Sequence, residues 1–284
     1  MIEITMGIVS LLLKRRYRIT AELPSKRETP IQGFRVWDGE DPQRDILYIV
    51  EDERSRGSAE KKGLLCIGIR YAQSPARHGC QRIFVEEPMS LYALINALQE
   101  VFQKFYGWQM RMEQLFYTHA GFKEILNEVE GTFGLVSLLV DKNLQYVEAS
   151  DSYGLYNDWI GDGQSMPSDL IDDMMQDENF RMAIQHDRAF YYDNVYTKTC
   201  VYCYNIKIKG AYEARLLLQD KTGGPVPGGL TLAGYVGEHL AEMFAWQERE
   251  RMQERVLYDL YEILKELLQG IPKDADEIRQ KLAV

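Results

Sequence analysis

Cysteine is scarce in this sequence, with 4 in 284 residues, at Cys66, Cys80, Cys200 and Cys203. So few thiols in a chain of this length exclude a disulfide scaffold and favour free cysteines in a cytoplasmic protein. Long apolar runs are also missing. The apolar stretch Ile8–Leu13 is far shorter than the roughly 18 residues that cross a bilayer, and basic residues follow it instead of preceding it. We therefore expect neither a secretory signal nor contact with a membrane.

The sequence has no excess of basic residues. Lys and Arg together number 33 and Asp and Glu number 43, which gives a net charge of −10. This balance argues against a constitutive nucleic-acid surface, which requires a basic face. The hydrophobic share of 45% is ordinary for a globular protein, and the length predicts about two domains.

Catalytic motifs are missing too. The sequence has no G-x-S-x-G, no H-E-x-x-H and no P-loop, because the Gly/Pro-rich segment Gly223–Gly229 lacks the Lys-Ser/Thr that grips a phosphate. The four histidines show no ligand spacing. Asp172 and Asp173 are neighbours, and adjacent side chains diverge by about 100° on a helix. We expect no enzyme, no metal site and no cofactor.

Residues 1–88 predict a small α/β domain. Thr5 is a plausible N-cap for a helix over Ile8–Leu13, and Glu53–Lys62 is compatible with a second helix. Short apolar runs, several of them continuous as in strands covered on both faces, predict five strands: Arg18–Leu23, Gly33–Trp37, Ile46–Val50, Leu64–Ile69 and Arg82–Val85.

Residues 89–119 predict one long linker helix, because apolar side chains repeat every seven residues for roughly 40 Å of helix. Two rows follow this repeat: Leu91, Leu98, Phe105 and Met112, and beside them Leu94, Val101, Trp108 and Leu115. A stripe this wide requires a partner, and we expect this helix to contribute to a dimer.

Residues 120–230 predict a second, α+β domain. A helix over Phe122–Glu130, which we expect Gly131 to end, leads into a hairpin of Leu135–Val140 and Leu144–Ala149. After a helix over Ser168–Gln176 come the expected strands Phe190–Tyr192, Thr199–Lys207 and Glu213–Leu218.

Two features of this second domain are candidates for function. Cys200 and Cys203 form a C-x-x-C, but in a strand residues three apart face opposite sides, so two inert side chains are the favoured interpretation. Tyrosines are unusually frequent here and offer both apolar area and a hydroxyl to a ligand. The expected pocket residues are Tyr153, Tyr156, Trp159 and Tyr202. The alternative is that these rings only pair across the sheet.

Residues 231–269 predict a second long helix, apolar at both ends and charged over Gln247–Arg255. Its distal apolar residues Leu257, Leu260 and Leu264 are candidate dimer contacts. Residues 270–284 resemble the start of a further domain.

The order of elements resembles the PucR/CdaR-type bacterial transcription regulators. The stretch Leu91–Trp108 is similar to their linker helix, and Phe133–Ser150 is similar to the opening of their sensor domain. Pro167–Leu170 and Leu260–Gly270 match later helices, and Asp274–Val284 matches the start of the domain that follows.

The resemblance covers most of residues 45–284 and implies a GAF- or PAS-like sensor domain behind the small α/β domain. It further implies a nucleotide-cyclase-like domain and a helix-turn-helix beyond this sequence. We therefore expect the sensory half of a regulator, which by itself does not bind DNA specifically.

Two hypotheses remain open from the sequence. In the first, the chain is a homodimer that binds a small-molecule effector and passes the change along its long helices. In the second, it is a dimerisation scaffold of the GAF/PAS type without a ligand. A cavity of a few hundred Å3 in the second domain favours the first hypothesis, and a face filled with side chains favours the second.

Overall fold

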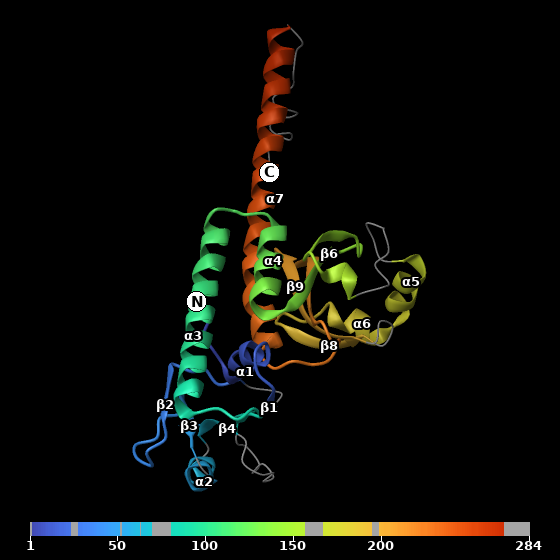
Figure 1. The fold of residues 1–284 in the computed structure, drawn as a ribbon. Helices are drawn as coiled ribbons and strands as arrows, with labels where there is room; N and C mark the ends of the chain where they lie inside the picture. Colours follow the sequence, from blue (N-terminus) through green and yellow to red (C-terminus); the bar gives the residue numbers. More distant parts are fainter. Residues whose placement is uncertain are drawn as a thin grey trace.

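The computed structural model describes residues 2–23, 28–51, 53–62, 64–69, 81–156, 167–194 and 199–269. Two five-stranded sheets lie at either end of a helical layer, and one long helix rises from this body (Figure 1). The fold is α+β, as the sequence predicts. No helix within the described ranges combines the length and apolar character needed to span a bilayer.

The first sheet has the strand order β1-β5-β4-β3-β2. Its strands are β1 (Ile19–Glu22), β2 (Gly33–Val36), β3 (Ile46–Val50), β4 (Leu65–Ile69) and β5 (Arg82–Val85). Strands β2 to β5 run parallel, and β1 pairs antiparallel with β5. The central strands are apolar along their whole length because both faces of this sheet are covered.

Three helices provide that cover: α1 (Met6–Lys14), α2 (Glu53–Lys61) and α3 (Leu91–Tyr117). One face of the sheet packs with α1 and α3 in the main core, and the other packs with α2 in a smaller cluster that includes Tyr48 and Cys66. The expected cap is confirmed, because the Thr5 hydroxyl accepts a hydrogen bond from the Ile8 N–H. These contacts fix α1 at the centre of the molecule.

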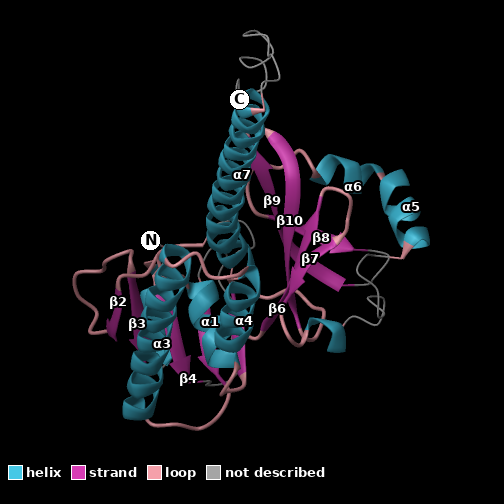
Figure 2. Cartoon of the chain, turned by 90° about the horizontal axis from the view of Figure 1, so that it is seen from above, coloured by secondary structure: helices cyan, strands magenta, loops and turns pink. Residues whose placement is uncertain are grey.

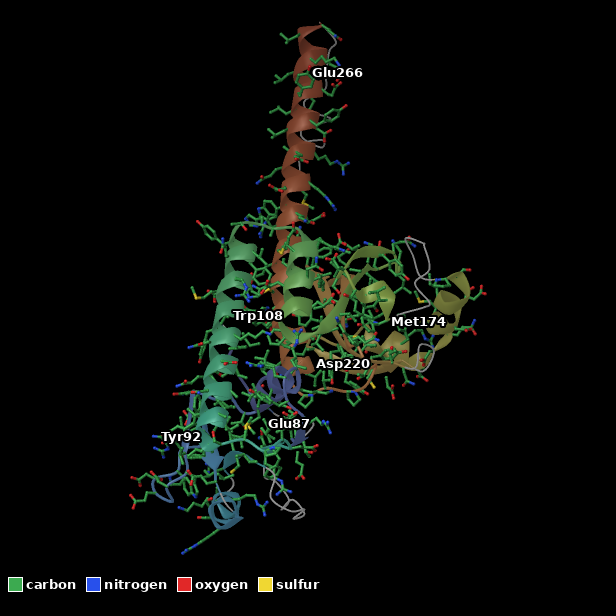
Figure 3. All side chains as sticks on the ribbon, viewed as in Figure 1. Glu87, Tyr92, Trp108, Met174, Asp220 and Glu266 are labelled. Atoms are coloured by element: carbon green, nitrogen blue, oxygen red, sulfur yellow. The ribbon has the colours of Figure 1, made fainter. Side chains whose placement is uncertain are left out.

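Helix α3 uses its apolar stripe inside this chain. Leu98, Phe105, Trp108 and Met112 are fully buried, and Leu94 and Val101 nearly so. The Trp108 ring points from α3 toward its neighbours (Figure 3) and lies 4.7 Å from that of Phe133 and 5.5 Å from that of Tyr235.

The apolar rows of α3, which we expected to contact a second copy, are buried within this chain. Its two rows pack on α1, α4 (Phe122–Phe133) and α7 (Gly229–Leu268) of the same chain. Leu91 and Leu115, at its ends, are partly buried against the same core. A heptad repeat specifies that a helix needs a partner, but it does not specify whether the partner belongs to another copy.

The second sheet is entirely antiparallel, in the order β7-β6-β10-β9-β8. Its strands are β6 (Leu135–Asp141), β7 (Tyr146–Ala149), β8 (Phe190–Asn194), β9 (Thr199–Ile208) and β10 (Ala211–Asp220). Helices α4 and α7 cover one face. The other face carries the short 3-10 turn η1 (Tyr153–Leu155) and the helices α5 (Ser168–Gln176) and α6 (Glu178–Ala183) (Figure 2).

The end of α4 differs from the expectation. The helix runs through Gly131 to Phe133, and the next residue, Gly134, takes a left-handed conformation with φ +78° and donates its N–H to the Glu130 carbonyl. Both glycines could end a helix in principle, but only one of them lies where the chain must turn into β6.

Helix α7 packs directly on β9 through two glycines. A Cβ at Gly229 would lie 2.4 Å from the ring of Tyr202, and one at Gly237 would lie 2.2 Å from the ring of Tyr204. The tyrosine rings therefore rest on the helix backbone itself, and the sheet and α7 are in close contact.

Candidate functional site

The structure separates the predicted pocket tyrosines. Tyr153 is 1% exposed in the core beneath α5 and α6, whereas Tyr202 lies on the opposite face of the sheet. Tyr156 is 42% exposed on the surface. Trp159 lies outside the described residues. The three described side chains therefore do not line one common pocket.

Tyr202 has a structural contact of its own. Its hydroxyl donates to the Val226 carbonyl and accepts from the Val226 N–H, both at 2.6 Å. Burial raises the pKa of this hydroxyl. Tyr202 thus holds the segment that leads into α7, and both of its hydrogen-bonding directions are occupied.

A hollow of about 800 Å3 lies where the segments beside Thr5 and Glu28, the second sheet and the start of α7 meet. We call it the junction groove. Its lining includes Arg188, Tyr204, Tyr235 and Glu238. This volume is in the range of small-molecule sites. A molecule bound there would contact the N-terminal segment at Thr5 and Glu28, the second sheet and α7.

Glu28 forms the inner wall of the junction groove and joins three segments. Its carboxylate accepts hydrogen bonds from the hydroxyls of Thr5 and Thr231, both at 2.6 Å, and from the Gly228 N–H at 2.7 Å. These donors lie at the first turns of α1 and α7, where the helix dipoles favour a negative charge. Glu28 therefore ties the N-terminal unit to α7.

His239 lies at the same groove on α7. Its ring stacks on Phe116 at 4.1 Å and meets Tyr235 edge-on at 4.7 Å. Burial lowers the pKa of His239, while the Glu242 carboxylate 3.6 Å away acts in the opposite direction. The imidazole is thus held toward its neutral form as part of the aromatic contact between α3 and α7.

A second hollow, of about 700 Å3, lies where α7 leaves the body, between Phe244 on the helix and the turns of the second sheet. One wall carries the ion pair of Lys142 with Glu213 at 2.8 Å. The other wall carries Glu248 and Arg251. Because both walls carry charges of both signs, this hollow favours no single charge class of ligand.

The cysteines of the C-x-x-C face opposite sides of β9, as the strand alternation predicts. Cys203 is fully buried, and burial raises the pKa of its thiol to about 11. Cys200 accepts a hydrogen bond from the Tyr191 hydroxyl at 2.7 Å on the other face. Within the part of the chain that the structure describes, no group of three His, Cys, Asp or Glu side chains could hold a metal ion.

One polar side chain that sequence reasoning missed is Arg215 on β10, which is 2% exposed. Its Nε donates to the Asn205 side-chain oxygen at 2.8 Å, but its Nη2 has no hydrogen-bond partner among the described residues. A signal was present in the sequence. Alternation along Ala214–Leu218 gives Arg215 the same face as Leu217, which is a core residue.

Comparisons with known proteins identify no family. No family model matches the sequence, and no curated protein matches it. Among solved structures, the chain is similar to the Bacillus subtilis YkuI protein, a protein with an EAL domain solved with its substrate c-di-GMP and calcium. The identity is 10% and the TM-score 0.19, over 61% of this chain and 56% of that one, so this chain spans little more than half of its length.

Proposed function

We propose that this chain is a dimerising, ligand-sensing regulatory region. In this proposal a small molecule binds the unit built on the second sheet, and α7 carries the resulting change out of the body. The family resemblance would place a DNA-binding output domain at the end of that route. The free thiols Cys66, Cys200 and Cys203 support a cytoplasmic location.

The observation that carries this proposal is a heptad spacing of apolar side chains at both ends of α7, in one common register. In its proximal half the a and d positions are apolar and buried in the body, with at most 5% exposure: Ala233, Val236, Leu240 and Met243. In its distal half the same positions are apolar and exposed, between 51% and 88%: Leu257, Tyr261, Leu264 and Leu268. We call this second set the distal seam.

Between the two halves the repeat is polar, with Gln247, Glu250 and Glu254 at the a and d positions. This break coincides with the place where α7 leaves its partners. The stacked pairs His119–Trp246 and Phe122–Phe244 lie near that exit. Beyond it α7 extends away from both sheets, and Glu266 lies near its far end (Figure 3).

A second copy of α7 fits the distal seam best. The proximal half already satisfies its a and d positions within the chain, so the distal seam requires a helix that the body does not provide. Burying leucine-sized side chains contributes about 1.5–3 kcal/mol each when the burial is complete. A symmetric pair buries the same seam on both copies at once.

A scaffold without a ligand is the second candidate. The face of the second sheet beneath α5 and α6 favours it, because Tyr153, Phe180, Phe190 and Cys203 fill that face as a packed cluster. The two candidates share the dimer and differ only in whether a small molecule binds.

Sedimentation equilibrium of a charged variant of the distal seam tests the dimer. We expect the wild type to be a dimer at about 10 µM, and we expect Leu257→Lys together with Leu264→Lys to lower the dimer association constant at least 100-fold. Met110→Lys is the matched control. It is an exposed apolar residue on α3, 71% exposed, and should leave the dimer intact. A variant that dimerises as strongly as the wild type would overturn the assignment of the seam.

A further inference from the structure

We propose that Arg215 anchors a binding site for a small organic anion on the α5/α6 face of the second sheet. The recognised group would be a carboxylate or a phosphate. That this site serves sensing rests on the proposed function, whereas anion binding at Arg215 can be tested without it.

The burial of Arg215 is the first observation. Arg215 is 2% exposed, and no carboxylate of the described residues lies within ion-pair distance of it. Asn205 lies opposite Arg215 on the neighbouring strand β9, and its side-chain oxygen accepts a hydrogen bond from the Arg215 Nε. A guanidinium is protonated under all ordinary conditions, so it cannot escape this position by losing its charge. A buried charge of this kind requires a counter-charge.

Aromatic rings surround the guanidinium but do not neutralise it. The Arg215 Cζ lies 5.0 Å from the ring centre of Phe180 and 5.6 Å from those of Phe190 and Tyr212. Such contacts attract a cation through the ring faces. They accept no N–H hydrogen bond of normal strength, and the Nη2 atom stays without a partner.

A series of hydrogen bonds through Asn205 fixes the orientation of the Arg215 guanidinium. Asn205 accepts from the Arg215 Nε and, through its own side-chain nitrogen, donates to the carbonyls of Ala183 at 2.7 Å and His186 at 3.0 Å. Nη2 lies beside Nε on the same edge of the guanidinium, so the Asn205 contact also holds Nη2 in place, and Nη2 has no acceptor of its own among the described residues. A preorganised arginine Nη2 without an acceptor can donate a charge-assisted hydrogen bond to a carboxylate or phosphate oxygen.

The position of Arg215 also links such a site to α7. Asn205 and Tyr204 are consecutive residues of β9 and face opposite sides of the sheet. On its own side, Tyr204 rests on the backbone of α7 at Gly237. An anion that tightens the contact of Arg215 with Asn205 acts on the strand that supports the long helix.

The cover on the anion's side consists of α5 and α6, which are only 9 and 6 residues long. Because the cluster beneath these helices is packed, the anion reaches Arg215 only when this cover opens locally.

Thermal unfolding of the full chain with simple anions tests the site. The probes are sodium butyrate and sodium phosphate at constant ionic strength, with butyramide as the neutral counterpart of butyrate. We expect at least one anion to raise the wild-type Tm saturably, by about 5 °C at 100 times its Kd. Butyramide should give no shift. The probe that acts identifies the group as a carboxylate or a phosphate.

Two arginine variants locate the effect. Arg215→Met preserves much of the side-chain volume and should abolish the anion-dependent shift, whereas Arg188→Met, at the rim of the junction groove, should keep it. If Arg215→Met does not fold, Arg215→Lys serves instead, because it keeps the charge without the fork and should weaken binding at least 10-fold.

Three results would overturn the inference: no saturable shift with either anion, a shift that survives at Arg215→Met or Arg215→Lys unchanged, or a shift lost only at Arg188→Met. The dimer measurement is separate. A monomer that still binds butyrate or phosphate through Arg215 would reject the proposed regulatory dimer and leave the anion site in place.

Discussion

At the scale of single residues, the molecule depends on a few polar side chains that join elements far apart in the sequence. Glu28 connects the starts of α1 and α7 through three hydrogen bonds, and Asn205 connects β9 to the end of α6. Sequence patterns show apolar periodicity but not which polar residue meets which. That is why neither residue was among the candidates, and why the tyrosines were grouped although the sheet separates them.

Removing the Glu28 carboxylate should weaken this connection. We expect Glu28→Ala to lower the free energy of unfolding by about 2–3 kcal/mol, since three donors lose a charged acceptor. Glu3→Ala, an exposed carboxylate of the same groove, should change it by no more than about 0.5 kcal/mol. Urea denaturation measures both. Equal effects of the two variants would contradict the structural role given to Glu28.

His239 gives a prediction about pH. Because burial lowers its pKa in the folded state, the unfolded chain binds the proton more readily. The neutral His239 ring therefore leaves the folded state at full stability above the unfolded pKa of about 6.5. This stability is lost as the pH falls from that value toward the lower pKa of His239 in the folded state.

His239→Gln should accordingly lose less stability than the wild type between about pH 7 and pH 5. Unfolding midpoints measured across this range test the difference. His119→Gln, at an exposed histidine that stacks on Trp246, is the control for replacing a histidine on this side of the molecule. Parallel curves for wild type and His239→Gln would reject the explanation.

At the scale of elements, local pattern predicted the strands and long helices well. Every strand expected in the first sheet overlaps an observed one, from β1 to β5. Helix α6 was not expected, since its six residues are too few to show a period. The apolar stripe of α3, which we expected to face a second copy, is buried by tertiary contacts within the chain, and no local pattern encodes such contacts.

Glycines on two helices should respond in opposite ways to the same change. Gly237→Ala should destabilise the protein despite the better helix propensity of alanine, because its Cβ would lie 2.2 Å from Tyr204. Gly131→Ala, where a Cβ meets nothing within 4 Å, should stabilise it by about 0.5–1 kcal/mol. Thermal unfolding of the two variants tests this, and a stabilised Gly237→Ala would contradict the packing of α7 on β9.

At the scale of the whole molecule, both sheets and the helical layer share one main core. Helix α7 begins in that core, beside Glu28, Tyr202 and Tyr204, and ends far from it (Figure 1). In the proposed function, α7 is the route by which a change at the second sheet would reach a distant partner. The sequence indicated the length of this helix. The structure adds that the apolar a and d positions are buried in its proximal half and exposed in its distal half.

Native mass spectrometry of the chain purified without added ligand tests the central claim most directly. The regulatory proposal predicts a particle of two chains, each of 33.0 kDa. If a ligand stays bound through purification, the particle also carries an excess of a few hundred daltons. A particle with the mass of a single chain, at concentrations where the distal seam should pair, would contradict the proposal.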